Sequence, residues 1–153
     1  MLSDRIEKTT NVEYIIDTNK LVQFICEAII DRQAKNVVIF NVEDQLTCGS
    51  RIILCNGSAT RQVRAIAENV LYTLKKEHGE LPLGVEGRGL DQWVIIDYGS
   101  VILHVFQPEM REYYNLDGLW AESPIIELSD LGIDIEEDDS ESEEESSSYF
   151  HDL

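Results

Sequence analysis

Apolar residues recur every three or four positions in two stretches of the chain, and this spacing predicts two amphipathic helices. The first helix should begin at about residue 17. Its apolar positions are Leu21, Phe24, Ile25, Ala28 and Ile29. The second stretch has the more regular pattern, with apolar residues at Val63, Ile66, Ala67, Val70, Leu71 and Leu74. Ser58 or Thr60 offers a cap for its first turn, and Gly79 can adopt the left-handed conformation that ends a helix.

Short apolar runs rich in β-branched residues predict five strands. They are residues 37–40, 52–55, 83–86, 93–98 and 101–106. Only Gly99-Ser100 separates the last two runs, which predicts a hairpin. Pro108 followed by Glu109 is typical of a helix start, so a short helix should follow, with another helical turn at 116–120. This order predicts one α/β domain, a mixed five-stranded sheet with flanking helices.

The distribution of charge divides the chain into three parts. The 153 residues carry a net charge of −18, and residues 129–153 hold 11 acidic residues but no Lys or Arg. The other 19 acidic residues oppose all 12 Lys and Arg, so the rest of the chain has a net charge of −7. A segment so rich in Glu, Asp and Ser buries too little apolar surface to fold. We therefore expect an N-terminal arm at 1–16, a folded domain at 17–128 and a disordered acidic tail at 129–153.

Charge and hydropathy also restrict the class of partner. An acidic surface repels phosphate, so we expect no direct nucleic-acid binding and consider a basic protein the more suitable partner. No apolar run approaches the ~20 residues of a membrane helix, and no signal peptide is visible, which favours a cytoplasmic protein without membrane contact. The cysteines at 26, 48 and 55 form no CxxC pair. Cys26 and Cys55 lie in apolar runs, where a free thiol should be a small buried hydrophobic group.

Few residues suggest reactive chemistry. Gly57-Ser58 ends a predicted strand and begins a helix, and the helix N-terminus there could bind a phosphate. Nucleotidyltransferases combine such a turn with closely spaced carboxylates for Mg²⁺, but here the nearest equivalent is Asn41 with Glu43. His104 is alone in an apolar run, where histidine is usually structural. We predict no catalytic residue, no metal ligand and no cofactor. A nucleotide-binding or nucleotidyltransferase-type enzyme that uses Gly57-Ser58 is the alternative hypothesis.

The run 93–98 is the best candidate for a contact surface. Alternation along a strand places Trp93, Ile95 and Asp97 on one face and Tyr98 on the other. If one face is exposed, Trp93, Ile95 and the nearby Tyr98 make an aromatic, partly polar patch of the kind that anchors protein interfaces. If it is buried, the same residues belong to the core. The periodicity leaves both interpretations open.

Several short motifs, taken in order, resemble the ribosomal silencing factor family, also called the RsfS or Iojap-like family. They are Gly-Ser-Ala-Thr-Arg-Gln-Val at 57–63, Val-Glu-Gly at 85–87, Trp-Val-Ile-Ile-Asp-Tyr-Gly at 93–99, His-Val-Phe at 104–106, Glu-x-Arg-Glu-x-Tyr at 109–114 and Leu-Trp at 119–120. The similarity extends from about residue 18 to residue 128. It implies a nucleotidyltransferase-like α/β fold that has lost its catalytic residues.

The resemblance also implies a function. Such proteins bind ribosomal protein fourteen of the large subunit, hinder association with the small subunit and repress translation; they are often seen as homodimers. By matching positions, the implied contact residues are Trp93, Ile95, Asp97 and Tyr98. Two features depart from the family. Ser50-Arg51 replaces the usual Asp-Tyr, so Arg51 on a docking surface would weaken contact with a basic partner. The acidic tail is not general in the family, and it either solvates the protein or contacts basic ribosomal surface or RNA-binding proteins.

Overall fold

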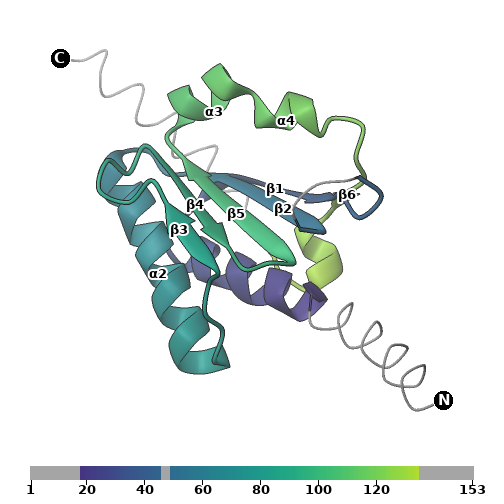
Figure 1. Ribbon diagram of the computed structural model, residues 1–153, viewed down its shortest axis with the longest axis horizontal. Helices are drawn as coiled ribbons and strands as arrows, with labels where there is room; N and C mark the ends of the chain where they lie inside the picture. The colour runs from purple at the N-terminus through teal and green to yellow at the C-terminus, as the bar shows by residue number, and fades with distance from the viewer. Residues whose placement is uncertain (1–17, 46–48, 135–153) are drawn as a thin grey trace.

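Residues 18–45 and 49–134 are described by the computed structural model, and they form a mixed six-stranded sheet with helices on both faces (Figure 1). In chain order, the elements are a helix over residues 18–31, β1 (Lys35–Asn41), β2 (Arg51–Asn56), α2 (Thr60–His78), β3 (Gly84–Glu86), β4 (Trp93–Asp97), β5 (Val101–Phe106), α3 (Pro108–Tyr114), α4 (Leu116–Leu119), β6 (Ile125–Ile126) and a 3₁₀ helix at Leu128–Leu131. The predicted α/β class is confirmed.

The strands lie in the order β3-β4-β5-β2-β1-β6. β2 and β5 form the parallel pair, and the other neighbouring strands are antiparallel. The Gly99-Ser100 hairpin between β4 and β5 occurs as predicted, and its register places Ile95 opposite His104. On the other side of β5, His104 is opposite Leu54 of β2. His104 therefore lies at the centre of the sheet.

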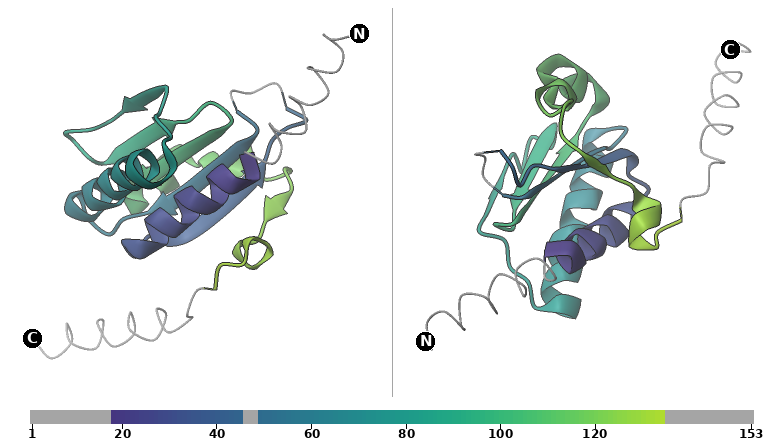
Figure 2. Two further views of the ribbon diagram at one scale, coloured as in Figure 1. Left: turned by 90° about the horizontal axis from the view of Figure 1, so that it is seen from below. Right: turned by 90° about the vertical axis from the view of Figure 1, so that its right-hand side faces the viewer.

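One face of the sheet carries the main core, because the helix over 18–31 and α2 both pack across it (Figure 2). The predicted apolar stripe of α2 is confirmed, since Val63, Ile66, Ala67, Val70 and Leu74 are all buried. Cys26 and Cys55 are free thiols with no exposed surface in this core. Burial raises the pKa of the Cys26 thiol to about 12, and that of Cys55 further still. Both behave as the buried hydrophobic groups that the sequence predicts.

The opposite face carries a smaller apolar cluster beneath α3, α4 and the residues that follow them. Its buried members are Phe40, Val42, Ile52, Leu54, Phe106 and Trp120. Burial alternates along β4, where Val94 and Ile96 of the main core are buried and Trp93, Ile95 and Asp97 are half-buried. The second face is therefore only partly covered.

The structure corrects two expectations about these elements. The sheet has a sixth strand, because Ile125 and Ile126 pair with Phe40 and Ile39 of β1. Neither predicted residue caps α2: Ala59 holds the N-cap position without a side-chain bond, and the backbone N–H and Oγ of Ser58 bind Gln62 Oε1 instead.

Regular structure continues beyond residue 128. The 3₁₀ helix at Leu128–Leu131 follows, and the apolar residues 128, 131 and 133 pack against the main core. The expected arm at 1–16 and the rest of the expected tail, 135–153, lie outside the described residues.

Candidate protein-docking face

We use the term open face for the half-covered side of β4 and β5, defined by Trp93, Ile95, Asp97, Ile102 and His104. All five side chains lie on the side of the sheet opposite the helix over 18–31 and α2, because strand residues alternate between faces. A shallow pocket of about 330 Å³ lies along it. Glu86 of β3 and Trp120 beyond α4 add to its lining. Two of the four implied contact residues, Ile95 and Asp97, thus line a pocket, and a third, Trp93, lies on the same face.

Trp93 anchors an aromatic cluster at one end of the open face. The register places it opposite Phe106, and the two rings stack with centroids 5.0 Å apart. The ring of Tyr114 in α3 packs against the same indole, with 4.9 Å between the ring centroids. The indole Nε1–H donates a hydrogen bond to Nδ1 of His104, with 3.0 Å between the nitrogens. These contacts hold Trp93 in one orientation, with part of its ring still accessible to a partner.

His104 is a buried, neutral residue on this face. Its side chain is enclosed by the rings of Trp93, Phe106 and Trp120. Burial lowers the pKa of His104 from the ordinary 6.5 to about 4, because the charged imidazolium loses its hydration there. The sequence-based interpretation of a structural histidine agrees with these contacts. Its position beside a pocket could not be inferred from spacing alone.

Asp97 and Ile95 complete the contact strand. Asp97 Oδ1 accepts a 2.7 Å hydrogen bond from the backbone N–H of Gly99, which has φ +89°. The carboxylate therefore stabilises the hairpin turn through one oxygen and leaves the other for contacts beyond the turn. Ile95 is half-buried between the edge strand β3 and β5. The open face thus combines an aromatic end, an apolar middle and an acidic end.

Tyr98 is not part of this arrangement. It lies on the opposite side of the sheet, where it packs into the main core with 9% of its surface exposed. Its hydroxyl is buried and has no hydrogen-bond partner among the described residues. Burial, with a smaller contribution from Glu80, raises the pKa of Tyr98 to about 12. The resemblance implied a direct contact role for Tyr98, whereas the structure places it behind the strand.

Replacing Tyr98 by phenylalanine should leave the free energy of unfolding unchanged or raise it by up to about 1 kcal/mol, because a buried hydroxyl without a partner contributes a desolvation penalty. Urea unfolding followed by circular dichroism measures this change. A loss of more than 1 kcal/mol would show that the hydroxyl has a partner in solution.

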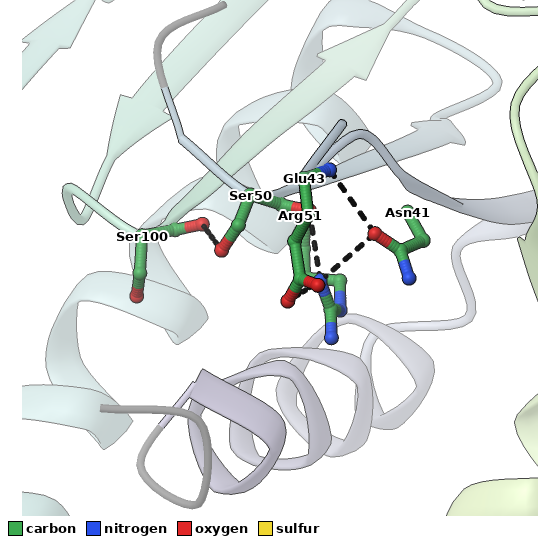
Figure 3. A network of polar contacts seen from close by, with 5 residues as sticks. All are labelled: Asn41, Glu43, Ser50, Arg51 and Ser100. Carbon is green, nitrogen blue, oxygen red and sulfur yellow. Dashed lines mark hydrogen bonds and ion pairs between the residues drawn. The ribbon is translucent and has the colours of Figure 1, made fainter. Parts of the chain in front are cut away.

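Arg51, which the sequence analysis considered for the docking surface, does not lie on the open face. It is 5% exposed and lies on the helix-covered side at the start of β2. Its Nη1 donates hydrogen bonds to Asn41 Oδ1, to Glu43 Oε1 at 2.7 Å and to the Ser50 carbonyl (Figure 3). Asn41 and Glu43, the nearest equivalent of a catalytic carboxylate pair, are therefore occupied by Arg51. This network ties β1 to β2.

Arg111 holds α3 and α4 against the sheet. Its Nε and Nη2 form a two-pronged ion pair with Asp117, each at 2.9 Å. Its Nη1 donates to the Asn36 carbonyl at 2.6 Å and to Asn56 Oδ1 at 2.9 Å. The hydrogen bonds from Arg111 are the main reason that the pKa of Asp117 is lowered. Since α3 carries Tyr114 and α4 leads to Trp120, Arg111 positions the aromatic border of the open face.

The Gly57-Ser58 turn packs closely on the start of α2, and its serine already has a partner there. A Cβ on Gly57 would lie 2.8 Å from the backbone nitrogen of Val63, so this glycine permits close packing of the turn on α2. Ser58 is engaged by Gln62, whose amide in turn binds the carbonyls of Arg32 and Gln33. Within residues 18–45 and 49–134, no three His, Cys, Asp or Glu side chains are grouped to hold a metal ion.

No helix in the described part of the chain is long and apolar enough to cross a membrane. The fold and the open face together define the class of the protein, a single-domain α/β protein with one sheet face covered by helices and the other left partly accessible.

The family model for "Ribosomal silencing factor during starvation" matches residues 15–152. The chain is 34% identical over 113 residues to ribosomal silencing factor RsfS of Halalkalibacterium halodurans, covering 74% of this chain and 96% of that protein. It is 35% identical over 101 residues to the RsfS protein of Haemophilus influenzae, covering 66% and 98%. A crystal structure of a protein from Chromobacterium violaceum superposes with a TM-score of 0.64 at 32% identity, covering 67% of this chain and 84% of that one. The chain belongs to the ribosomal silencing factor family.

Proposed function

We propose that this protein represses translation by binding ribosomal protein fourteen of the large subunit through its open face. Bound there, it excludes the small subunit sterically and catalyses no reaction. The observation that carries the proposal is a half-covered sheet face that presents Trp93 and a pocket lined by Ile95 and Asp97, in a chain of the silencing factor family. Tyr98 is left out of the proposed contact set, since its side chain is buried behind the strand.

The charge of the molecule supports a basic protein partner. The chain outside residues 129–153 carries a net charge of −7, and Glu86 and Asp97 line the pocket of the open face. Complementary charge speeds the encounter of two proteins and fixes their relative orientation. The same acidic character disfavours direct contact with the RNA backbone, so recognition is proposed to occur through protein. We expect this interaction in the cytoplasm.

The first test is replacement of Trp93 by alanine. Loss of a buried aromatic anchor at an interface commonly costs about 2 kcal/mol or more, so affinity for large subunits should fall by about thirtyfold. Co-sedimentation with purified large subunits, and titration of purified ribosomal protein fourteen, measure this loss. Tyr72→Ala on α2 is the matched control, because Tyr72 is an aromatic residue with 60% exposure on the helix-covered side. It should bind as the unmodified protein does.

Ile95→Lys provides a second test, with a substitution that should disturb the fold less than Trp93→Ala. Ile95 is half-buried, so a lysine there can extend into solvent while it introduces positive charge toward a basic partner. Binding should fall by at least tenfold, with circular dichroism unchanged. Joining of large and small subunits, followed by light scattering, should be slowed by the unmodified protein and not by this variant. If both variants bind normally, the open face is not the docking surface.

A further inference from the structure

The pocket on the open face has a polar group in its lining that the docking role alone does not explain. Ile95, Ile102 and Trp120 provide apolar walls, and the exposed Glu86 and half-buried Asp97 provide an acidic rim. His104, which is 8% exposed, lines the same pocket. A nearly buried imidazole in an apolar pocket needs hydrogen-bond partners for both of its nitrogens.

One nitrogen has its partner within the protein. The indole Nε1–H of Trp93 is a donor only, so the Nδ1 atom of His104 that it contacts at 3.0 Å must act as an acceptor. A neutral imidazole that accepts at Nδ1 carries its proton on Nε2. Trp93 therefore selects the tautomer of His104. Burial keeps this ring neutral at physiological pH.

The other nitrogen has no acceptor in the described part of the chain. None of the hydrogen bonds there involves Nε2 of His104. Three side-chain atoms in the described residues are fully enclosed and have no hydrogen-bond partner: Thr18 Oγ1, Arg51 Nε and Tyr98 Oη. Nε2 of His104 is not one of them, so it is not fully enclosed. Nε2 must then reach accessible space, and the accessible space beside His104 is the pocket. The lining of the pocket thus includes one oriented N–H donor.

The rim determines what can approach this donor. The carboxylates of Glu86 and Asp97 disfavour an anionic acceptor, since like charges at short range repel. A neutral oxygen, such as a main-chain carbonyl, meets no such repulsion. A carbonyl flanked by basic residues would in addition be attracted by the rim.

We infer that His104 is a specificity residue of the docking face, whose Nε2–H donates a hydrogen bond to a main-chain carbonyl of the protein partner while Trp93 holds the imidazole in the required tautomer. This inference rests on the proposed function, because it names the chemical group that the same face recognises. The inference assigns two different roles to residues of the open face. Trp93 and Ile95 provide contact area, and His104 disfavours any surface that has no hydrogen-bond acceptor at this position. A partner surface that lacked the carbonyl would leave the Nε2–H buried and unpaired.

The tautomer can be measured directly in the intact protein. Long-range ¹H–¹⁵N correlation spectra distinguish a protonated Nε2 from a protonated Nδ1, and should show protonated Nε2 for His104 at pH 7. Trp93→Phe removes the indole donor but keeps an aromatic ring, so the spectrum should shift toward a mixture of the two tautomers. A protonated Nδ1 in the unmodified protein would overturn the inference, whatever the variants do.

Binding to purified ribosomal protein fourteen tests the role of the donor. His104→Phe keeps an aromatic ring among the neighbouring rings but has no N–H, and should weaken binding about tenfold, the usual effect of one lost hydrogen bond. His104→Gln places an amide N–H near the position of Nε2, and should recover most of that loss. Thermal unfolding of both variants is recorded alongside, so that a binding change can be compared with any folding change.

The outcomes separate this inference from the proposed function. If Ile95→Lys abolishes binding but His104→Phe binds like the unmodified protein, the face docks and the inference about His104 is wrong. If Ile95→Lys also binds normally, the proposed function itself fails, and the inference fails with it. If His104→Phe and His104→Gln weaken binding equally, the imidazole acts by shape and the proposed hydrogen bond does not exist.

Discussion

Replacing Arg111 by methionine should lower the free energy of unfolding by about 2–4 kcal/mol, because acceptors that the buried guanidinium now satisfies would be left unpaired. Methionine fills a similar volume but leaves the Asn56 amide oxygen and the Asn36 carbonyl without their donor. Asn36 has a left-handed backbone, φ +52°, at the irregularity in β1, so its carbonyl would also lose the contact that orients it. Urea denaturation followed by far-ultraviolet circular dichroism measures the change.

Glu112→Gln is the matched control for this experiment. Glu112 is the next residue along α3 and is exposed, so its replacement should change stability by less than 0.5 kcal/mol. Asp117→Asn should have an intermediate effect, because Asp117 is 40% exposed and water can replace part of its interaction with Arg111. A loss below 1 kcal/mol for Arg111→Met would mean that α3 and α4 are held mainly by apolar packing around Trp120.

Acidification from pH 7 to pH 4 should destabilise the protein through His104 by up to about 3 kcal/mol. The pKa of His104 is about 4 in the folded protein and about 6.5 in an unfolded chain, so between these values the unfolded state binds more protons. The contribution of His104 to stability is therefore complete above pH 6.5 and falls steadily as the pH approaches 4. Protonation of Nδ1 would also remove the acceptor that Trp93 requires.

His104→Phe isolates this contribution from that of the carboxylates, which are present in both proteins. Stability should be measured by urea unfolding at several pH values between 4 and 7.5. The unmodified protein should lose stability more steeply than the variant, and the two curves should run parallel above pH 7. Parallel curves across the whole range would show that His104 titrates normally and is not enclosed as the structure indicates.

Local patterns were sufficient to predict most of the regular structure. The apolar stripe of α2, its end at Gly79, the hairpin at Gly99-Ser100 and the proline that begins α3 all depend on residues close together in sequence. Periodicity and turn chemistry carry such information directly. Strand β6 was not predicted, because two residues are too few to show a periodic pattern. Ile125–Ile126 forms a strand only because β1 lies beside it.

The candidate site was predictable only in part. The alternation of side chains along a strand placed Trp93, Ile95 and Asp97 on one face and Tyr98 on the other. It could not show which of the two faces the helices would cover. The resemblance implied a contact role for Tyr98, because a motif match gives the order of residues along the chain but not the direction in which each side chain points. Burial of Tyr98 followed from the packing of α2 and the helix over 18–31 on its side of the sheet.

The amino-acid sequence by itself determined the class of fold, the order of its elements and the resemblance to silencing factors, since these depend on neighbouring residues and on motif order. Only the tertiary structure decided that Arg51 links β1 to β2 inside the protein. The same holds for the contacts by which Arg111 fixes α3 and α4 and by which Trp93 sets the tautomer of His104. Those contacts join residues 8, 75 and 11 positions apart. A polar side chain selects its partner by distance and direction in space, and neither quantity is written in local sequence.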